Sequence, residues 1–170
     1  MPDESITGRV AGQQAESESE PECYSCGREA ESDSLPAWES IAVDDHWRVV
    51  HAFGVSLPGW LVLLPRRHVT SIAELTDAEA ELLGGWQVRL SRALAVVTGC
   101  AKTYVAQFAE REGFAHVHFH LVPRAADLPE SVRGPRVFGL MGGTGLPAGE
   151  LDRIALRIRS VLDGGEKKNV

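Results

Sequence analysis

Three histidines spaced two residues apart constrain the fold of this chain more than any other feature. In the segment HVHFHLVPR (116–124), His116, His118 and His120 alternate with valine, phenylalanine and leucine. Strict alternation of polar and apolar side chains is typical of a β-strand with one buried face. We therefore expect a strand over residues 115–122, with apolar side chains in the core and three imidazoles together on the opposite face.

Other segments predict further strands. WRVVHAF (47–53) and WLVLLP (60–65) are rich in β-branched and aromatic residues, and the turn signal between them predicts an antiparallel pair. A third strand is expected over KTYVAQFA (102–109), followed by a hairpin-like connection over residues 110–113. Together with residues 115–122, these segments predict a small antiparallel sheet.

Two helices complete the predicted α+β class. Thr76 and Glu79 have the spacing of a capping box, in which each side chain accepts a backbone N–H of the first helical turn. A helix is therefore expected over residues 76–98, ending before Gly99. A C-terminal helix is indicated by the spacing of Leu151, Ile154, Ile158 and Leu162.

The charge is uneven along the 170 residues. The net charge of −7 is carried by residues 1–34, which hold nine acidic and two basic side chains. Residues 1–20 lack apolar mass, so we expect a disordered acidic tail followed by a single domain over 21–170. The neutral body argues against non-specific binding of nucleic acid. No apolar run is long enough for a membrane span and no signal peptide is visible, so a cytoplasmic location is expected.

The three cysteines argue against a disulfide framework, because their number is odd. Cys100 stands alone and is expected in the core. Cys23 and Cys26 form a C-x-x-C pair, which metal sites, redox pairs and incidental pairs in a tail all share.

Three imidazoles on one strand face suit two chemistries, metal ligation and transfer of a phosphoryl or nucleotidyl group through histidine. The plainer alternative is an exposed polar strand face that tolerates histidine. Three histidines in register, with no lysine, glutamate or threonine among them, favour a site over that alternative.

The His-x-His-x-His motif, followed by two apolar residues, resembles the signature of the histidine triad (HIT) superfamily of nucleotide hydrolases and transferases. LPGWLVLLPRRHVTSIAELTDAE (57–79) and Pro123-Arg124 are also similar, and the resemblance covers about residues 23–124. It implies a HIT-like fold: an antiparallel sheet of about five strands, a long central helix and a C-terminal helix. Residues from about 125 onward form a C-terminal extension, in which 137–145 would shape the leaving-group side.

The resemblance also implies roles for individual residues. His118 would attack the α-phosphorus of a nucleotide and form a nucleotidyl-histidine intermediate, and His120 would bind the phosphate. Gln107 aligns with a position whose amide contacts substrate, although a surface glutamine is an equal reading. His51 lies near the ribose-contacting position, and Gly113 falls in the loop that contacts the phosphate.

Some branches of the superfamily carry a structural zinc, and the resemblance implies its four ligands here. They would be Cys23, Cys26, His68 and His116. Two thiolates and two imidazoles are a tetrahedral set that suits zinc. The alternatives are a redox or incidental cysteine pair and a simple surface role for His68.

Three positions depart from the pattern of the superfamily. Many relatives have a histidine where this chain has Trp60, and a Gly-Gln-Ser or Gly-Gln-Thr loop where it has Glu112 and Gly113. The first hypothesis is therefore a nucleotide hydrolase that cleaves a 5′-phosphoryl bond of a dinucleoside polyphosphate or a nucleoside phosphoramidate. The alternatives are a nucleotide-binding sensor with little catalysis and a nucleotidyltransferase. Many relatives are homodimers, so a homodimer is also possible.

Overall fold

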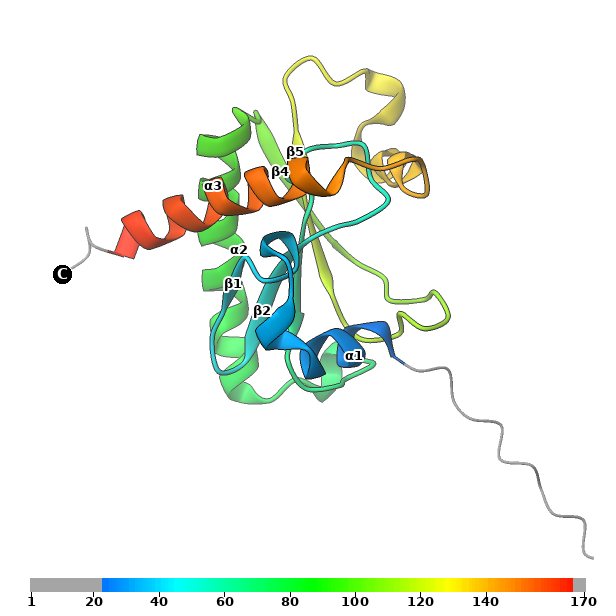
Figure 1. Cartoon of the computed structure of the whole chain (residues 1–170). Coiled ribbons are helices and arrows are strands. Elements are labelled where there is room, and N and C mark those ends of the chain that lie inside the picture. The colour runs from blue at the N-terminus through cyan, green and yellow to red at the C-terminus, as the bar shows by residue number, and fades with distance from the viewer. Residues whose placement is uncertain (1–22, 167–170) are drawn as a thin grey trace, which may run out of the picture.

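The structure is a computed structural model, and it describes residues 23–166 (Figure 1). The predicted tail over residues 1–20 lies outside this range. Within the described residues no helix has the length and apolar character needed to cross a membrane. The helices and strands are α1 (Tyr24–Ala30), β1 (Ala42–Val43), β2 (Trp47–His51), β3 (Leu61–Pro65), α2 (Asp77–Thr98), β4 (Lys102–Gln107), β5 (Phe119–Arg124) and α3 (Ala148–Glu166).

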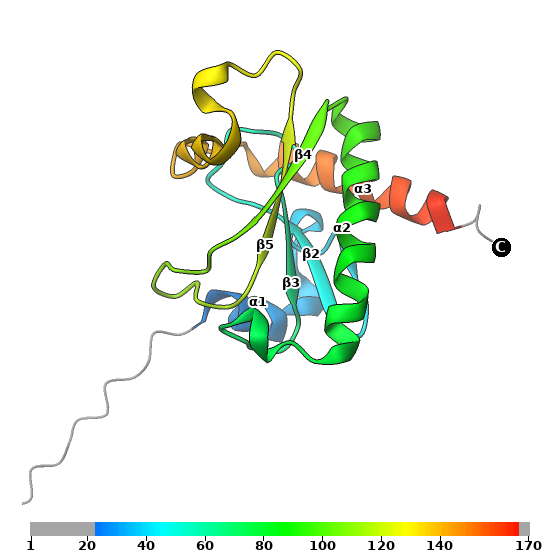
Figure 2. The same ribbon diagram turned by 180° about the vertical axis from the view of Figure 1, so that it is seen from behind.

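The strands form one antiparallel sheet in the order β1-β2-β3-β5-β4, which confirms the α+β class with five strands. β2 and β3 pair as predicted, and β4 pairs with β5 across the connection at 110–113. The long helix α2 lies along one face of the sheet, and α3 crosses beside it (Figure 2). The main core is formed between this face and the two helices.

The capping signals of α2 are confirmed in detail. The Thr76 backbone N–H donates to the Glu79 carboxylate at 2.7 Å, and the Glu79 N–H donates to the Thr76 hydroxyl at 3.3 Å. Gly99 ends the helix with φ +68°, a left-handed conformation that glycine adopts without steric cost. Trp86, Leu90 and Leu94 lie on the buried face of the helix.

The strand carrying the triad begins later than expected, at Phe119 instead of residue 115. Its neighbour β4 ends at Gln107, which pairs with Phe119, and the pairing with β3 also stops at Phe119, so the residues before Phe119 have no ladder partner. The Val117 N–H instead donates to the Val69 carbonyl at 2.8 Å. The alternation of faces still holds, because Val117 and Phe119 enter the main core. His116 and His118 therefore lie just before the strand, and His120 lies within it.

Three other strand ends also differ from prediction. β2 ends at His51 instead of residue 53, β3 begins at Leu61, and β4 ends at Gln107 instead of residue 109. At the last of these, Ala109 has φ +54°, which is incompatible with an extended strand. Strand pairing and backbone geometry determine where these strands begin and end, although the apolar sequence pattern continues beyond those residues.

The second face of the sheet, opposite α2, positions the candidate site. The register places Arg48 beside Leu64 and Val62 beside His120 on this face. Near one end lies α1, and at the other lies the extension after β5 (Figures 1 and 2). The extension contains two 3₁₀ segments, Glu130–Val132 and Gly134–Leu140, and it joins the 52–57 loop through a bridge between Val55 and Met141.

Candidate active site and metal centre

A cavity of about 500 Å³ opens on the second face of the sheet. His118 and His120 line it, together with residues from α1, the loops after β2 and β4, and the C-terminal extension. The cavity has a polar part around the histidines and an aromatic part near α1. A cleft of this size that is mostly apolar and has a few convergent polar groups is typical of a small-molecule site.

The tautomer of His118 is set by the backbone two residues earlier. Its Nδ1 lies 2.7 Å from the carbonyl oxygen of His116. A carbonyl oxygen only accepts, so Nδ1 carries the proton and Nε2 holds the lone pair. Histidine with a lone pair directed away from its hydrogen-bond partner is a potential nucleophile.

His120 is held in the opposite tautomer. Its Nδ1 accepts a hydrogen bond from the indole N–H of Trp60 at 3.1 Å, so its proton is on Nε2. Burial lowers the pKa of His120 to about 3, and the neighbouring His118 adds to this effect. The ring centroids of His118 and His120 lie 4.8 Å apart, and the two ring planes are inclined at 80°. A nucleophilic nitrogen and a neutral N–H donor therefore lie side by side in the cavity.

The aromatic part of the cavity is formed by side chains from four separate segments. Tyr24 of α1 lies 5.3 Å from Phe53 and 5.2 Å from Phe114, measured between ring centroids. Trp38 approaches Phe53 at 6.5 Å. Tyr24 and Phe53 are both partly exposed, although they pack against one another. Such a cluster accommodates a planar ring by stacking.

The loop between β4 and β5 borders the cavity through Ala109, Glu110 and Arg111. Glu112 and Gly113, the residues expected at the phosphate, are not among the residues that line it. The Gly113 carbonyl instead accepts a hydrogen bond from the Tyr24 N–H at 3.0 Å. The Arg111 guanidinium lies 5.3 Å from the Phe114 ring centroid. The charges nearest the site from this loop are thus Glu110 and Arg111.

The structure does not bring Gln107 into the cavity. Gln107 is the last residue of β4 and pairs with Phe119, whose side chain packs in the main core. Directly paired residues share a face, so Gln107 is on the helix face of the sheet. Its neighbour Phe108 lines the cavity instead.

His51 borders the cavity but has a structural set of contacts. It pairs with Leu61 of the core face and is fully buried. Its Nδ1 donates to the Ala52 carbonyl at 2.7 Å, and its Nε2 accepts the Gly59 N–H at 2.9 Å. Burial lowers its pKa, which keeps the ring neutral. Both nitrogens are therefore engaged within the protein, and neither is directed to a ligand.

The four residues predicted as metal ligands come together beside the cavity. Ligand atoms of Cys23, Cys26, His68 and His116 all lie within 4.8 Å of one another. Cys26 Sγ is 3.3 Å from His68 Nδ1, and both cysteine sulfurs are 3.6 Å from His116 Nδ1. Zinc bonds of about 2.0–2.3 Å in a tetrahedron separate neighbouring ligand atoms by about 3.5 Å, so the arrangement fits that metal.

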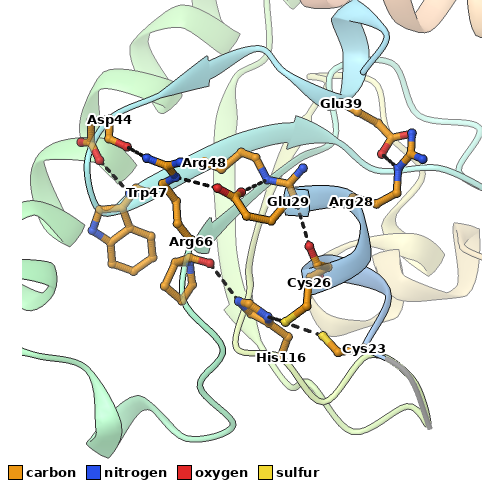
Figure 3. A network of polar contacts seen from close by, with 12 residues as sticks. Cys23, Cys26, Arg28, Glu29, Glu39, Asp44, Trp47, Arg48, Arg66 and His116 are labelled. Carbon is orange, nitrogen blue, oxygen red and sulfur yellow. Dashed lines mark hydrogen bonds and ion pairs between the residues drawn. The ribbon is translucent and has the colours of Figure 1, made fainter. Parts of the chain in front are cut away.

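The orientation of His116 supports ligation. Its Nε2 donates to the Pro65 carbonyl at 2.8 Å, which leaves the Nδ1 lone pair facing the sulfurs (Figure 3). Metal-bound histidines are usually fixed in this way by their second nitrogen. Burial raises the pKa of the Cys26 thiol to about 11, and Cys23 adds to the shift.

Ion pairs join α1 to the sheet next to the metal ligands. The Glu29 carboxylate lies between Arg48 at 3.3 Å and Arg66 at 2.7 Å (Figure 3). Arg28 forms two hydrogen bonds to Glu39 at 2.6 and 2.8 Å. α1 has no buried residue of its own. These ion pairs, the Tyr24 contacts and the metal ligands are therefore what hold it in place.

Sequence reasoning missed three residues that shape the site. Tyr24 lines the cavity from between the two cysteines, and Phe138 packs its ring 5.1 Å from His120 and 5.3 Å from Trp60. Trp60 itself was expected only as a departure from the superfamily. The aromatic residue within C-x-x-C was a usable signal for Tyr24. Phe138 lies within residues 137–145, which the resemblance placed beside the leaving group, but its ring was not singled out.

Comparison with known proteins rests on structure. No protein-family model matches the sequence, and no curated protein matches it. Among solved structures, a hypothetical histidine triad nucleotide-binding protein from Sulfolobus tokodaii superposes with a TM-score of 0.67 at 14% identity, covering 86% of this chain and 96% of that one. A zinc-bound histidine triad family protein from Mycobacterium smegmatis gives a TM-score of 0.64 at 16% identity, over 86% and 97% of the two chains.

A third similar structure is the diadenosine triphosphate hydrolase of Plasmodium falciparum, in complex with cyclomarin A. Its TM-score is 0.57 at 15% identity, covering 76% of this chain and 80% of that one. These superpositions establish the architecture. Sequence identities this low leave the activity to be argued from the residues of the site. The chain therefore has the fold of the histidine triad proteins.

Proposed function

We propose that the protein is a nucleotide hydrolase that uses His118 as its nucleophile. The observation that carries this proposal is the 2.7 Å contact between His118 Nδ1 and the His116 carbonyl, which leaves Nε2 unprotonated in a cavity beside a second histidine. The similarity to a diadenosine triphosphate hydrolase and to a nucleotide-binding histidine triad protein supports the same class of ligand.

The reaction has two displacements at the α-phosphorus. His118 Nε2 forms a P–N bond while the bond to the leaving group breaks, and the leaving group takes the electron pair. A phosphate leaving group departs as the anion, and an amine also takes up a proton from solvent. The imidazole then carries a positive charge, because Nδ1 keeps its proton, and the His116 carbonyl stabilises that charge. Water next attacks phosphorus, the P–N bond breaks, one proton is released, and a nucleoside 5′-monophosphate leaves.

The other groups of the cavity have matching roles. The His120 Nε2–H donates to a non-bridging phosphate oxygen, and the low pKa of His120 keeps this donor neutral at physiological pH. The aromatic cluster of Tyr24, Phe53 and Phe114 stacks on the nucleobase. Arg111, which lines the cavity and packs against Phe114, provides positive charge at its border.

Zinc is the metal that best fits the four clustered ligands. Cys23, Cys26, His68 and His116 would fill a four-coordinate site and leave no open position, so the metal would have a structural role. It would secure α1 against the sheet and hold His116, whose carbonyl orients His118. The zinc-bound relative with the same fold supports this assignment.

The deciding experiment measures turnover of a substrate panel by the wild type and by His118→Ala. The panel contains dinucleoside polyphosphates and an adenosine phosphoramidate, and release of mononucleotide is quantified. Rapid acid-free quenching at short times tests for a nucleotidyl-protein adduct by intact mass. We expect release and an adduct with the wild type, and neither with the variant.

Three other results have definite meanings. Nucleotide binding without turnover by the wild type favours the sensor hypothesis, for which the absence of the usual hydroxyl-bearing loop before the triad is the supporting observation. Adduct formation that is discharged only by an added alcohol or amine acceptor favours a nucleotidyltransferase. Turnover that persists in His118→Ala overturns the assignment of the nucleophile.

A further inference from the structure

Trp60 occupies a tightly defined position at the start of β3. It follows Gly59, whose φ of +83° favours glycine and whose N–H donates to the buried His51 ring. A Cβ at position 59 would lie 2.8 Å from a methyl group of Thr98. Packing and a hydrogen bond thus fix the turn at Gly59. This turn places the Trp60 indole on the second face of the sheet.

The indole ring is fully buried, and its N–H has one partner. It donates to His120 Nδ1 at 3.1 Å. The rings of Trp60 and His120 both make T-shaped contacts with the Phe138 ring. An indole N–H donates and never accepts, and it does not titrate in the physiological range. An imidazole at this position would be able to donate, accept or take up a proton. The Trp60–His120 contact therefore permits one tautomer of His120, in which Nδ1 accepts from the indole and Nε2 carries the proton.

We infer that Trp60 is a positioning residue that fixes the proton of His120 on Nε2, so that the site presents a constant N–H donor to the substrate phosphate. This inference rests on the proposed function for its substrate. If the proton moved to Nδ1, a lone pair on Nε2 would face the phosphate oxygens and repel them. The burial that lowers the pKa of His120 supports the same conclusion, because it prevents the doubly protonated form.

The test uses Trp60→Phe, which keeps an aromatic ring and removes the N–H. The matched control is Trp47→Phe, because Trp47 is equally buried and also donates at 3.1 Å, but to the backbone carbonyl of Glu79 in the core. Trp60→His is a second variant in case the phenylalanine fails to fold. Nitrogen-15 NMR of histidine-labelled protein reports which ring nitrogen of His120 is protonated, with His120→Gln identifying the signal.

We expect the wild type and Trp47→Phe to show His120 protonated only on Nε2 between pH 6 and 8. In Trp60→Phe the Nδ1 signal should lose its hydrogen-bonded shift and the two tautomers should mix. Turnover of the best substrate should fall about tenfold in kcat, the size expected when one hydrogen bond in a site is compromised. Trp47→Phe should lose thermal stability and keep its kcat.

A His120 proton on Nδ1 in the wild type, or an unchanged His120 spectrum and kcat in both Trp60 variants, would overturn the inference. The NMR measurement needs no substrate, so it separates this inference from the proposed function. If the wild type hydrolyses nothing, the affinity for AMP replaces kcat as the second readout. An unchanged tautomer together with an unchanged affinity in the Trp60 variants would then reject the role.

Discussion

The carbonyl oxygen of His116 accepts a hydrogen bond from His118 Nδ1 at 2.7 Å, while the ring of His116 faces two cysteine sulfurs. One residue therefore belongs to the metal cluster through its side chain and orients the candidate nucleophile through its backbone. The side chain in the candidate metal cluster and the carbonyl that holds His118 thus belong to the same residue.

Removal of the metal should weaken nucleotide binding. Tyr24 lies between Cys23 and Cys26 and forms part of the aromatic cluster, while α1 has no buried residue to hold it otherwise. We expect Cys26→Ser to abolish zinc binding and to weaken the affinity for AMP at least several-fold, measured by calorimetry with parallel metal analysis. Cys100→Ser is the control, because Cys100 packs against the main core, far along the chain from the cluster. Equal AMP affinity in zinc-free and zinc-loaded protein would contradict this coupling.

The aromatic cluster should provide much of the affinity for the nucleobase. Stacking of a base on an aromatic side chain contributes roughly 1–3 kcal/mol, so Phe53→Ala should weaken AMP binding by about tenfold or more. Ribose 5-phosphate, which has no base, should bind the variant and the wild type equally well. Leu156→Ala, at a half-exposed position on α3, is a control for general loss of apolar surface. If ribose 5-phosphate loses as much affinity as AMP, the cluster does not contact the base.

The charge of Arg111 should matter most for anionic leaving groups. Its guanidinium borders the cavity from the loop before β5. Arg111→Met should therefore lower kcat/KM for a dinucleoside polyphosphate more than for a phosphoramidate with an amine leaving group, by about tenfold in the ratio for one charge-assisted contact. Arg111→Lys should restore most of the ratio. A uniform loss on both substrates would show that Arg111 acts only by packing on Phe114.

The start of α2 should make stability depend on pH in the acid range. Hydrogen bonds from Arg67 and from the Thr76 N–H lower the pKa of Glu79 below its ordinary value of 4.5, against the effect of burial. The ionised carboxylate is therefore favoured in the folded state. Its contribution is complete above the unfolded pKa and is lost as the pH falls through the folded one.

Glu79→Gln should accordingly lower the free energy of unfolding at pH 7 by about 1 kcal/mol, the upper end for an ion pair with one exposed partner such as Arg67. The difference from the wild type should shrink below pH 4, as followed by urea denaturation. Glu81→Gln, an exposed substitution on the same helix, should change stability little at any pH. A destabilisation by Glu79→Gln that stays constant down to pH 3 would mean that the charge of Glu79 is not involved.

Local sequence patterns were sufficient for several parts of this protein. Alternation placed Val117 and Phe119 in the core and His118 on the other face, and the capping box located the start of α2. These features depend on residues a few positions apart, whose geometry is fixed by the period of a strand or helix. The four residues predicted as metal ligands do lie together, and the resemblance indicated them because it supplied a pattern that joins distant segments.

Tertiary structure alone decided how the cavity is completed. Whether His51 faces the core or a ligand depends on its register with β3, and the start of β5 at Phe119 depends on where β4 ends. The partner of the Trp60 indole lies sixty residues away, and the ring of Phe138 arrives from an extension without periodicity. Such contacts result from the packing of complete elements. The sequence by itself therefore determined the triad and the face of the sheet on which it lies. Only the folded chain determined which ring nitrogen of each triad histidine carries the proton.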